Sequence, residues 1–404
     1  MQANGSACSV GADDGLDARN RSEVPLRCWL QLLSEDEAVV EAARWEGAEA
    51  FASAALRAAI AAVYAAVCAL GLVGNALALC VLRRAARHGG ARRSSVNCFV
   101  MGLAATDLQF VLTLPFWAAD TALDFRWPFG KLMCKLVSSV TTMNMYASVF
   151  FLTAMSVTRY CALASPLPLR AVDACGGGGG GGAAGGARRA CVAIWLVSLT
   201  ATLPHAVYST TVRVMDDDEL CLVRFPDTGG WNPQQLLGLY QTQKVLVGFL
   251  VPLIVICACY VLLLRVVLRR RVSSGSEERV SSRRRRRSRV TRSVTVVVLS
   301  FFVCWLPNQA LTLWGVLIKF DLVPFTKAFY NAQVYAFPLT VCLAHANSCL
   351  NPVLYCLVRR EYRAGLKQLL LGTFARLARR GKKVAEAPKS STQGLAVVRV
   401  EGGL

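Results

Sequence analysis

The chain has 404 residues, of which 54% are hydrophobic and only 17% are charged, and its formal net charge is +20 at pH 7. In a soluble protein such a charge favours nucleic-acid binding, but here the basic residues gather between long apolar stretches. These stretches exclude a single soluble globular domain and favour an integral membrane protein without a nucleic-acid partner.

Residues 1–57 form a polar segment that we expect to be an extracellular, glycosylated tail. Ten acidic side chains against five basic ones give this segment a negative charge. It contains two Asn-x-Ser glycosylation acceptors, at Asn4 and Asn20, and both lie on the side predicted to be outside. Cys8 and Cys28 also lie in this tail, and the sequence leaves open whether they pair.

Residues 58–358 contain seven apolar stretches that predict a bundle of transmembrane helices. A helix needs about 20 apolar residues to cross a hydrocarbon core of roughly 30 Å. Within the stretches, only Asp107 and Lys244 are Asp, Glu, Lys or Arg residues. The predicted fold is therefore an all-α membrane protein. Its seven spans are Ala58–Leu82, Ser94–Ala119, Leu136–Thr158, Ala190–Val212, Leu236–Leu264, Ser293–Ile318 and Ala328–Val358.

Basic residues gather in alternate connecting segments. The segment 265–292 holds twelve Arg against two Glu, and the residues after 358 hold eleven basic side chains against three acidic ones. The positive-inside rule then places the N-terminus outside the cell and the C-terminus in the cytoplasm. Leucines on one face predict that residues 359–371 form an amphipathic helix on the membrane surface, followed by a cytoplasmic tail at 372–404.

Besides Cys8 and Cys28 in the tail, two of the 16 cysteines stand outside the apolar stretches on the predicted outer side. Cys134 lies at the outer start of the third stretch, and Cys221 lies between the fourth and fifth stretches. Because both face the oxidising compartment, we expect a disulfide between them that holds the long loop over the mouth of the bundle. Most other cysteines lie within the apolar stretches and are expected to pack there as small side chains.

The two charged residues inside the spans are candidate functional groups, because an ionisable side chain at bilayer depth is costly unless it is paired. Asp107 has polar candidates for partners on other stretches, and a neutral polar cluster that holds helices together is one interpretation of them. Lys244 is expected to meet an anion, for which a ligand carboxylate is a good candidate.

The outer end of the second stretch carries an indole and two carboxylates, Trp117, Asp120 and Asp124. Their spacing of three and four residues puts them on one face if the helix continues. Carboxylates beside an indole suit a cationic ligand group, especially Arg. The alternative is a solvated helix end that pairs with Arg126 or Lys131.

Four motifs occur in order along the stretches, and the set resembles the rhodopsin-like G-protein-coupled receptors. Asn75, Trp195, Pro252, Tyr260 and the cysteine pair add to the resemblance. The motifs are Leu103-Ala104-Ala105-Thr106-Asp107-Leu108, Thr158-Arg159-Tyr160, Cys304-Trp305-Leu306-Pro307 and Asn351-Pro352-Val353-Leu354-Tyr355.

The resemblance implies two sets of functional residues and several partners. An allosteric sodium site would be formed by Asp107, Asn144, Ser148, Asn347, Ser348 and Asn351. The activation switch would comprise Arg159, Tyr260, Trp305, Pro307, Asn351, Pro352 and Tyr355. The implied partners are a heterotrimeric G protein, arrestin, receptor kinases and plasma-membrane lipid.

A closer resemblance joins four segments to receptors for relaxin-family peptides: 116–130, 143–148, 219–226 and 307–312. It implies a two-chain, insulin-like ligand, with relaxin-3 expected and insulin-like peptide 5 or another basic neuropeptide as alternatives. It also implies an inhibitory G protein and a fall in cyclic AMP. Basic ligand side chains would meet Asp120 and Asp124, the aromatic end of the ligand would meet Trp117, and its terminal carboxylate would meet Lys244. Gln309 and Thr312, in the last segment, complete the expected ligand site.

Three other classes of protein are alternatives to a signalling receptor. Thr158 stands where the family usually carries an acidic residue, which keeps open a non-signalling receptor that scavenges peptide. A transporter or light-driven pump would need inverted repeats, broken helices or a Schiff-base Lys in the seventh stretch, and it is disfavoured because that stretch has no Lys. An enzyme is not expected, since no nucleophile–base constellation or phosphate-binding loop occurs.

Overall fold

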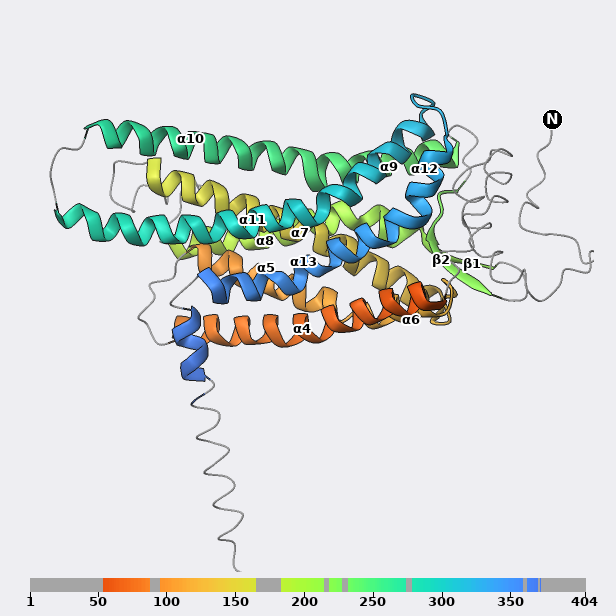
Figure 1. Cartoon of the computed structure of the whole chain (residues 1–404), viewed down its shortest axis with the longest axis horizontal. Helices are drawn as coiled ribbons and strands as arrows, with labels where there is room; N and C mark the ends of the chain where they lie inside the picture. The colour runs from red at the N-terminus through yellow and green to blue at the C-terminus, as the bar shows by residue number, and fades with distance from the viewer. Residues whose placement is uncertain are drawn as a thin grey trace, which may run out of the picture.

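The computed structural model describes residues 54–87, 95–164, 183–213, 218–226, 232–273, 278–358, 362–369 and 371. Long helices lie side by side in a bundle, with a two-stranded hairpin at one end (Figure 1). We call this the hairpin end. Asn4, Asn20, Cys8, Cys28 and the tail 372–404 lie outside the described residues, as do the side chains of Arg283–Arg287.

The described residues form helices throughout, apart from the hairpin and short turns. The spans in chain order are α4 (Ala54–Arg87); α5 (Ser95–Val111) with α6 (Leu114–Ala122); α7 (Gly130–Ala164); α8 (Ala183–Tyr208); α9 (Pro233–Val245), η4 (Leu246–Leu250) and α10 (Val251–Ser273); α11 (Glu278–Lys319); and α12 (Lys327–Asn331), η5 (Ala332–Ala336) and α13 (Phe337–Val358).

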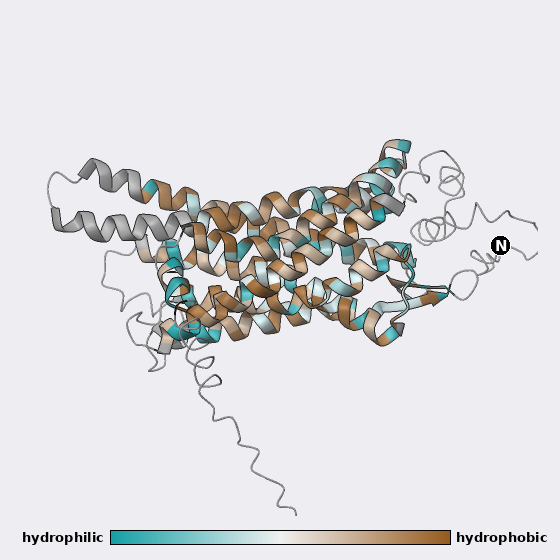
Figure 2. Cartoon of the chain, turned by 60° about the horizontal axis from the view of Figure 1, so that its bottom comes forward, coloured by the Kyte–Doolittle hydropathy of each residue, from teal (hydrophilic) through white to brown (hydrophobic). Residues whose placement is uncertain are grey.

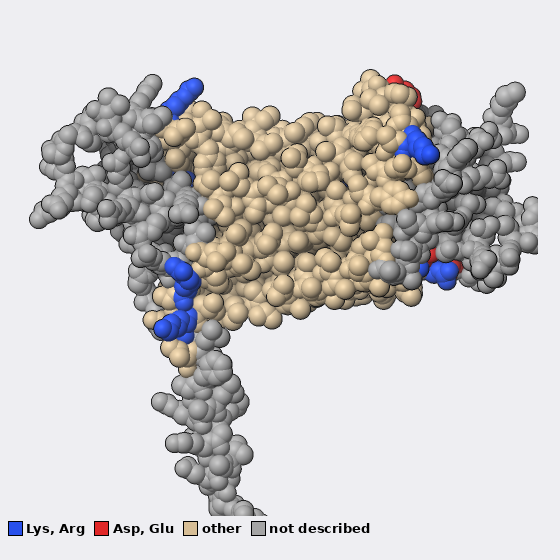
Figure 3. Space-filling view, in the orientation of Figure 1, with Lys and Arg blue, Asp and Glu red and all other residues tan. Residues whose placement is uncertain are grey.

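The predicted membrane-spanning bundle is confirmed. Six described helices are long and apolar enough to cross a membrane, and Phe337–Leu357 meets the same test when it is joined to the short helix Tyr362–Leu369, which is bent from it by 96°. Helix α13 packs against both α11 and α4, so the last span lies beside the first. Hydrophobic residues predominate along the middle of the bundle (Figure 2), and on the face shown in Figure 3 the charged side chains lie near its two ends.

Prolines account for the irregular places in three spans. Pro115 lies at the start of α6, after a turn in which Thr113 Oγ1 donates to the carbonyl of Phe110 at 2.7 Å. The two π-helical segments, η4 and η5, each end two residues before a proline, Pro252 and Pro338. A proline ring clashes with the carbonyl four residues earlier, and that residue lies within the π-helix in both cases, where the wider turn relieves the clash.

The fourth span ends earlier than the stretch Ala190–Val212 suggested, and it also begins earlier, at Ala183. Helix α8 ends at Tyr208, and the strand β1 (Ser209–Arg213) pairs antiparallel with β2 (Glu219–Val223). The residues Ser-Thr-Thr-Val in β1 carry no charge that would end an apolar stretch, but the β-branched Thr and Val side chains favour a strand. Hydropathy alone therefore extended the predicted helix into the hairpin.

A helix follows the last span, as predicted. Its described residues, Tyr362–Leu369 and Leu371, lie within the expected range of 359–371. Tyr362 is buried with its ring 6.2 Å from that of Tyr355, and Leu366 and Leu369 pack on the core of the bundle. The apolar face of this helix therefore lies against the bundle end opposite the hairpin.

Candidate functional site

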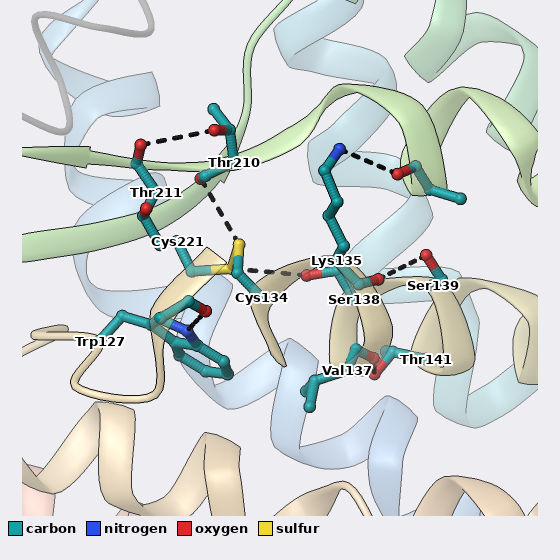
Figure 4. Close-up of a disulfide and its surroundings, with 12 residues drawn as sticks. Trp127, Cys134, Lys135, Val137, Ser138, Ser139, Thr141, Thr210, Thr211 and Cys221 are labelled. Carbon is teal, nitrogen blue, oxygen red and sulfur yellow. Dashed lines mark hydrogen bonds between the residues drawn. A yellow bond between two sulfur atoms is a disulfide. The ribbon is translucent and has the colours of Figure 1, made fainter. Parts of the chain in front are cut away.

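A disulfide holds the hairpin over the bundle. Cys134 in the first turns of α7 is bonded to Cys221 in β2, and 87 positions of sequence separate them. The backbone N–H of Trp127 donates to the carbonyl of Glu219 at 2.6 Å, and the Trp127 indole donates to the Gly130 carbonyl at 3.0 Å. Figure 4 shows Trp127 and the disulfide next to each other at the start of α7. The strand β2 is therefore fixed to α7 by a covalent bond and to the turn before α7 by a backbone hydrogen bond.

Trp117 faces the neighbouring helix α7. Its indole N–H donates to Thr141 Oγ1 at 3.0 Å, and its ring lies 5.8 Å from that of Trp127. Thr141 in turn donates to the carbonyl of Val137 at 2.9 Å. These contacts fix the orientation of the Trp117 ring, which is half-buried between α6 and α7.

Helix α6 does not continue as far as Asp124, so the condition under which Asp120 and Asp124 would share one helical face is not met. Helix α6 ends at Ala122, and Asp124 follows it in a left-handed conformation with φ of 62°. Asp120 is buried, with 8% of its surface exposed, and forms no salt bridge with any described residue. Because α6 ends at Ala122, before Asp124, the two carboxylates have different surroundings.

Asp124 pairs with a residue that the sequence did not point to. Its Oδ1 accepts from Arg57 Nη1 of α4 at 3.3 Å, and the two side chains are 17% and 15% exposed. The proposed partner Arg126 pairs instead with Asp218 at 3.1 Å. Burial raises the pKa of the Asp124 carboxyl, and the positive charges of Arg57 and Arg126 oppose that shift. The only signal for Arg57 in the sequence was a lone basic residue just before the first apolar stretch.

Lys244 lies on a different side of the bundle, where α9 packs against α11 while α6 packs against α4. Its Nζ is 5.8 Å from the centre of the Tyr240 ring. The Tyr240 hydroxyl and His205 Nδ1 are 2.6 Å apart, and sequence reasoning assigned neither residue a role. Lys244 forms no salt bridge with a carboxylate in the part of the chain that the structure describes.

Gln309 and Thr312 lie on α11, just after the proline inside this helix, Pro307. Gln309 is buried, and its Nε2 is 3.6 Å from Met145 Sδ of α7. Among the described residues, its Oε1 has no hydrogen-bond partner. Thr312 donates back to the carbonyl of Asn308 at 2.9 Å. Gln309 therefore has an unused acceptor in the interior, whereas the hydroxyl proton of Thr312 is used within its own helix.

A polar cluster surrounds Asp107 in the middle of the bundle. The amide groups of Asn144 and Asn351 donate to the two carboxylate oxygens at 3.1 and 2.8 Å. Asn75 donates to the backbone carbonyl of Ser348 at 2.9 Å, and Ser348 lies against Asp107. Three helices, α5, α7 and α13, thus meet at one buried carboxylate, with α4 joined through Asn75.

Several oxygen atoms in this cluster have no hydrogen-bond partner among the described residues. They include Ser148 Oγ, one turn from Asn144, together with Asn347 Oδ1 and Asn351 Oδ1 on successive turns of α13. A buried polar atom without a partner is costly. A carboxylate together with spare oxygen atoms on the same or neighbouring turns of its partner helices is the set of ligands that a hard cation such as sodium prefers. The residues expected for the ion therefore fit it chemically.

The remaining switch residues line the bundle from its centre toward the end opposite the hairpin. Trp305 is buried, and its ring lies 5.9 Å from that of Phe301. Tyr260 lies beside Ser156 and Thr295 and within electrostatic range of Arg159. Pro307 and Pro352 lie inside helices α11 and α13, where each removes a backbone donor. The structure thus brings the Arg159 end of α7 close to Tyr260 on α10.

Comparison with known proteins finds similarity to seven-transmembrane receptors throughout the bundle. The profile of the family described as "7 transmembrane receptor (rhodopsin family)" matches residues 74–355. The chain is 54% identical to the human "Relaxin-3 receptor 1" over 339 residues, covering 80% of this chain and 71% of that protein. It is 47% identical to the human "Relaxin-3 receptor 2", covering 79% and 77%. It is 33% identical to the "Type-1 angiotensin II receptor A" of Xenopus laevis, covering 76% and 78%.

Proposed function

Because the chain belongs to the rhodopsin family of seven-transmembrane receptors, we propose that it is a G-protein-coupled receptor for a relaxin-family peptide, with relaxin-3 as the preferred ligand. The similarity to relaxin-3 receptors supports a peptide receptor of the relaxin type. The observation that carries the proposal is the arrangement of charge at the hairpin end. A buried carboxylate, Asp120, lies near α4, and a cation without a described acidic partner, Lys244, lies near α11.

Such separated charges suit a ligand that presents basic side chains and a terminal carboxylate to different walls of one site. Asp120 and Asp124 bind the basic side chains, and the ligand replaces Arg57 at Asp124. Trp117, held by Thr141, presents an indole to an aromatic ligand residue. Lys244 binds the terminal carboxylate, and Gln309 Oε1 accepts a ligand N–H. Because these groups are partly buried, their charge-assisted hydrogen bonds are stronger than the same bonds in water.

The ligand's effect reaches the opposite end through the bent helices. Gln309 lies close to the bend at Pro307 and to Trp305, so a ligand bound to Gln309 favours one of two arrangements of α11. Movement of α11 and α13 exposes Arg159 to an inhibitory G protein, which lowers cyclic AMP, and arrestin and receptor kinases act at the same end. On this proposal the hairpin end is extracellular, the C-terminus is cytoplasmic, and the receptor lies in the plasma membrane.

A sodium ion would be held by Asp107 together with oxygens of Asn144, Ser148, Asn347, Ser348 and Asn351. It would supply a positive charge that balances the buried carboxylate and ties α5, α7 and α13 in one arrangement. The unpartnered oxygens of Ser148, Asn347 and Asn351 support this assignment.

Cells that express the chain test the proposal. Cyclic AMP is raised with forskolin, and relaxin-3 and insulin-like peptide 5 are titrated in parallel. We expect a fall in cyclic AMP that pertussis toxin abolishes. This fall should occur at lower concentrations of relaxin-3 than of insulin-like peptide 5. Asp120→Lys and Asp124→Lys should each weaken peptide binding at least tenfold, because each replaces an attraction with a repulsion. Asp321→Lys, which adds the same charge on the exposed turn after α11, is the matched control.

Three outcomes contradict parts of the proposal. A greater potency of insulin-like peptide 5 transfers the assignment to that ligand. Labelled peptide that binds without any fall in cyclic AMP favours a scavenging receptor, for which the Thr158 position is the supporting observation. Unchanged binding by both Asp variants, at equal surface expression, removes Asp120 and Asp124 from the site.

A further inference from the structure

A shallow hollow of about 390 Å³ lies at the hairpin end, where the start of α7, the end of α8 and the residues after β2 meet. Three cations line it, Lys131, Lys135 and Arg224, and no Asp or Glu does. Tyr208 and Phe225 form an aromatic wall, with ring centres 4.4 Å apart. None of these residues belongs to the expected peptide site or to the Asp107 cluster.

The hollow has a well-defined frame. The backbone N–H of Arg224 donates to the carbonyl of Tyr208 at 3.0 Å, which fixes the end of β2 to the end of α8. Lys135 Nζ donates to the carbonyls of Ala206, at 3.1 Å, and Val207 in the last turn of α8. Figure 4 shows Lys135 next to the disulfide that joins α7 to β2. An ammonium group has three N–H donors, so Lys135 retains one for a ligand.

The charge in the hollow is not balanced by the described part of the protein. Lys131 and Arg224 are exposed and form no salt bridge with a described carboxylate, whereas the nearby Arg126 and Arg213 pair with Asp218 and Glu219. Lys131 lies in the first turn of α7, which contains no acidic residue. The positive end of a helix dipole makes a cation unfavourable there and an anion favourable. The hollow is therefore suited to a negatively charged group.

Exposed apolar side chains continue from the hollow along both helices. Val207 lines the hollow itself, and Leu203 lies one turn deeper on α8. On α7, Leu132 is 78% exposed, and Leu136 is exposed one turn further along. All four residues belong to helices that are long and apolar enough to span a membrane. A ligand that suits this surface has an anionic head and an apolar tail.

We propose that the hollow binds the phosphate group of a phospholipid in the leaflet at the hairpin end. Lys131, Lys135 and Arg224 bind the phosphate oxygens, and the acyl chains lie along Leu132, Leu136, Leu203 and Val207. A bound lipid in this position balances the charge at the start of α7 and braces the α8–β2 junction. The site does not depend on the identity of the peptide ligand.

Native mass spectrometry of the purified full chain in detergent tests this site. The probes are phosphatidylglycerol, diacylglycerol with the same acyl chains, and inorganic phosphate. We expect phosphatidylglycerol to bind and diacylglycerol not to bind. Lys131→Gln and Arg224→Gln should each weaken phosphatidylglycerol binding about fivefold, since each removes one cation near the membrane surface. Arg224→Lys keeps the charge and should restore most of the binding.

Arg213→Gln is the matched control, because it removes one positive charge from the same hairpin outside the hollow. Equal binding of phosphatidylglycerol to the Arg224→Gln and Arg213→Gln proteins would overturn the proposal. Equal binding of diacylglycerol and phosphatidylglycerol would overturn the role of the phosphate. Binding of inorganic phosphate at comparable concentrations, with the same dependence on Arg224, would overturn a lipid as the source of the anion.

Discussion

Arg57 occupies a position that a basic ligand side chain would need. Its guanidinium lies 3.3 Å from Asp124, so a ligand arginine must displace it before Asp124 can be used. Asp120, in contrast, forms no salt bridge with a basic side chain among the described residues. At the scale of single residues, the two carboxylates are therefore unequal, although the sequence presents them as a pair.

Arg57→Gln should strengthen the binding of a basic peptide. A partly buried ion pair contributes about 1 kcal/mol, so the loss of the competing cation should raise the affinity about fivefold. Radioligand competition on membranes measures the change. Arg57→Lys keeps the competing charge and is the control; equal affinities of the Gln and Lys variants would contradict the competition.

Peptide binding should weaken as the pH falls, and Asp124 should account for part of this effect. Burial raises the pKa of Asp124, so its carboxyl takes up a proton at a pH above the ordinary range of aspartate. At pH values between the pKa of Asp124 in the unfolded chain and its higher pKa in the folded protein, the folded state binds more protons than the unfolded state. The contribution of Asp124 to the free energy of unfolding therefore falls as the pH rises through that window.

The control for this prediction is Asp124→Asn, which cannot ionise and also tolerates the left-handed conformation of this position. Binding is measured between pH 5 and 8, with cells kept at matched receptor density. In this variant, the share of the pH dependence of peptide binding that is due to Asp124 should be lost. A wild-type curve that runs parallel to the curve of the Asp124→Asn variant at all pH values would contradict the assignment.

Close helix packing decides several positions at the scale of elements. A Cβ atom on Gly102 of α5 would overlap the ring of Phe151 of α7. Phe151 is fully buried, with the rings of Phe99 and Trp195 at 6.4 and 6.3 Å, so it has little room to move. Small residues at such crossings let membrane helices approach closely, since apolar burial alone does not hold them together in lipid.

Gly102→Ala should destabilise the receptor by about 1 to 3 kcal/mol through overpacking. The thermal midpoint of the purified protein in detergent, followed by the loss of monodisperse material, is the measurement. Gly315→Ala on α11 is the matched control because its Cβ would lie an ordinary 3.6 Å from Phe329. A similar fall in both variants would show that helix packing at Gly102 is not the cause.

The membrane spans could be predicted from hydropathy, but the positions of the π-helical segments and of some helix ends could not. The two π-helical segments before Pro252 and Pro338 depend on how the chain relieves a local clash. The end of α8 at Tyr208 depends on pairing between β1 and β2, which brings together residues on both sides of an intervening turn. Pairing of that kind leaves no periodic signal in a hydropathy profile.

At the scale of the whole molecule, Asp107 joins helices that move relative to one another on the proposed function. It contacts Asn144 of α7 and Asn351 of α13, and these helices also carry Arg159 and Pro352. A cation at this point favours the arrangement in which the three helices are close. If the peptide favours the other arrangement, the two ligands oppose each other, and the coupling is reciprocal.

Sodium should therefore lower the affinity for the agonist peptide about fivefold, which corresponds to a coupling near the lower end of the usual range. Binding is compared in NaCl and in N-methylglucamine chloride at the same ionic strength. Asp107→Asn should remove the difference because it lacks the charge that holds the ion. A sodium response that persists in this variant would place the ion elsewhere.

The sequence by itself determined the membrane bundle, the order of its spans, the cysteines that meet in the disulfide and the polar residues that gather at Asp107. These features follow from hydropathy, from charge between the spans and from motifs that lie within single helices. Only the tertiary structure decided that α6 ends before Asp124, that Arg57 pairs with it, and that three cations surround one hollow beside β2. Those contacts join residues from different elements, and their geometry depends on where each helix stops and which neighbour it packs against.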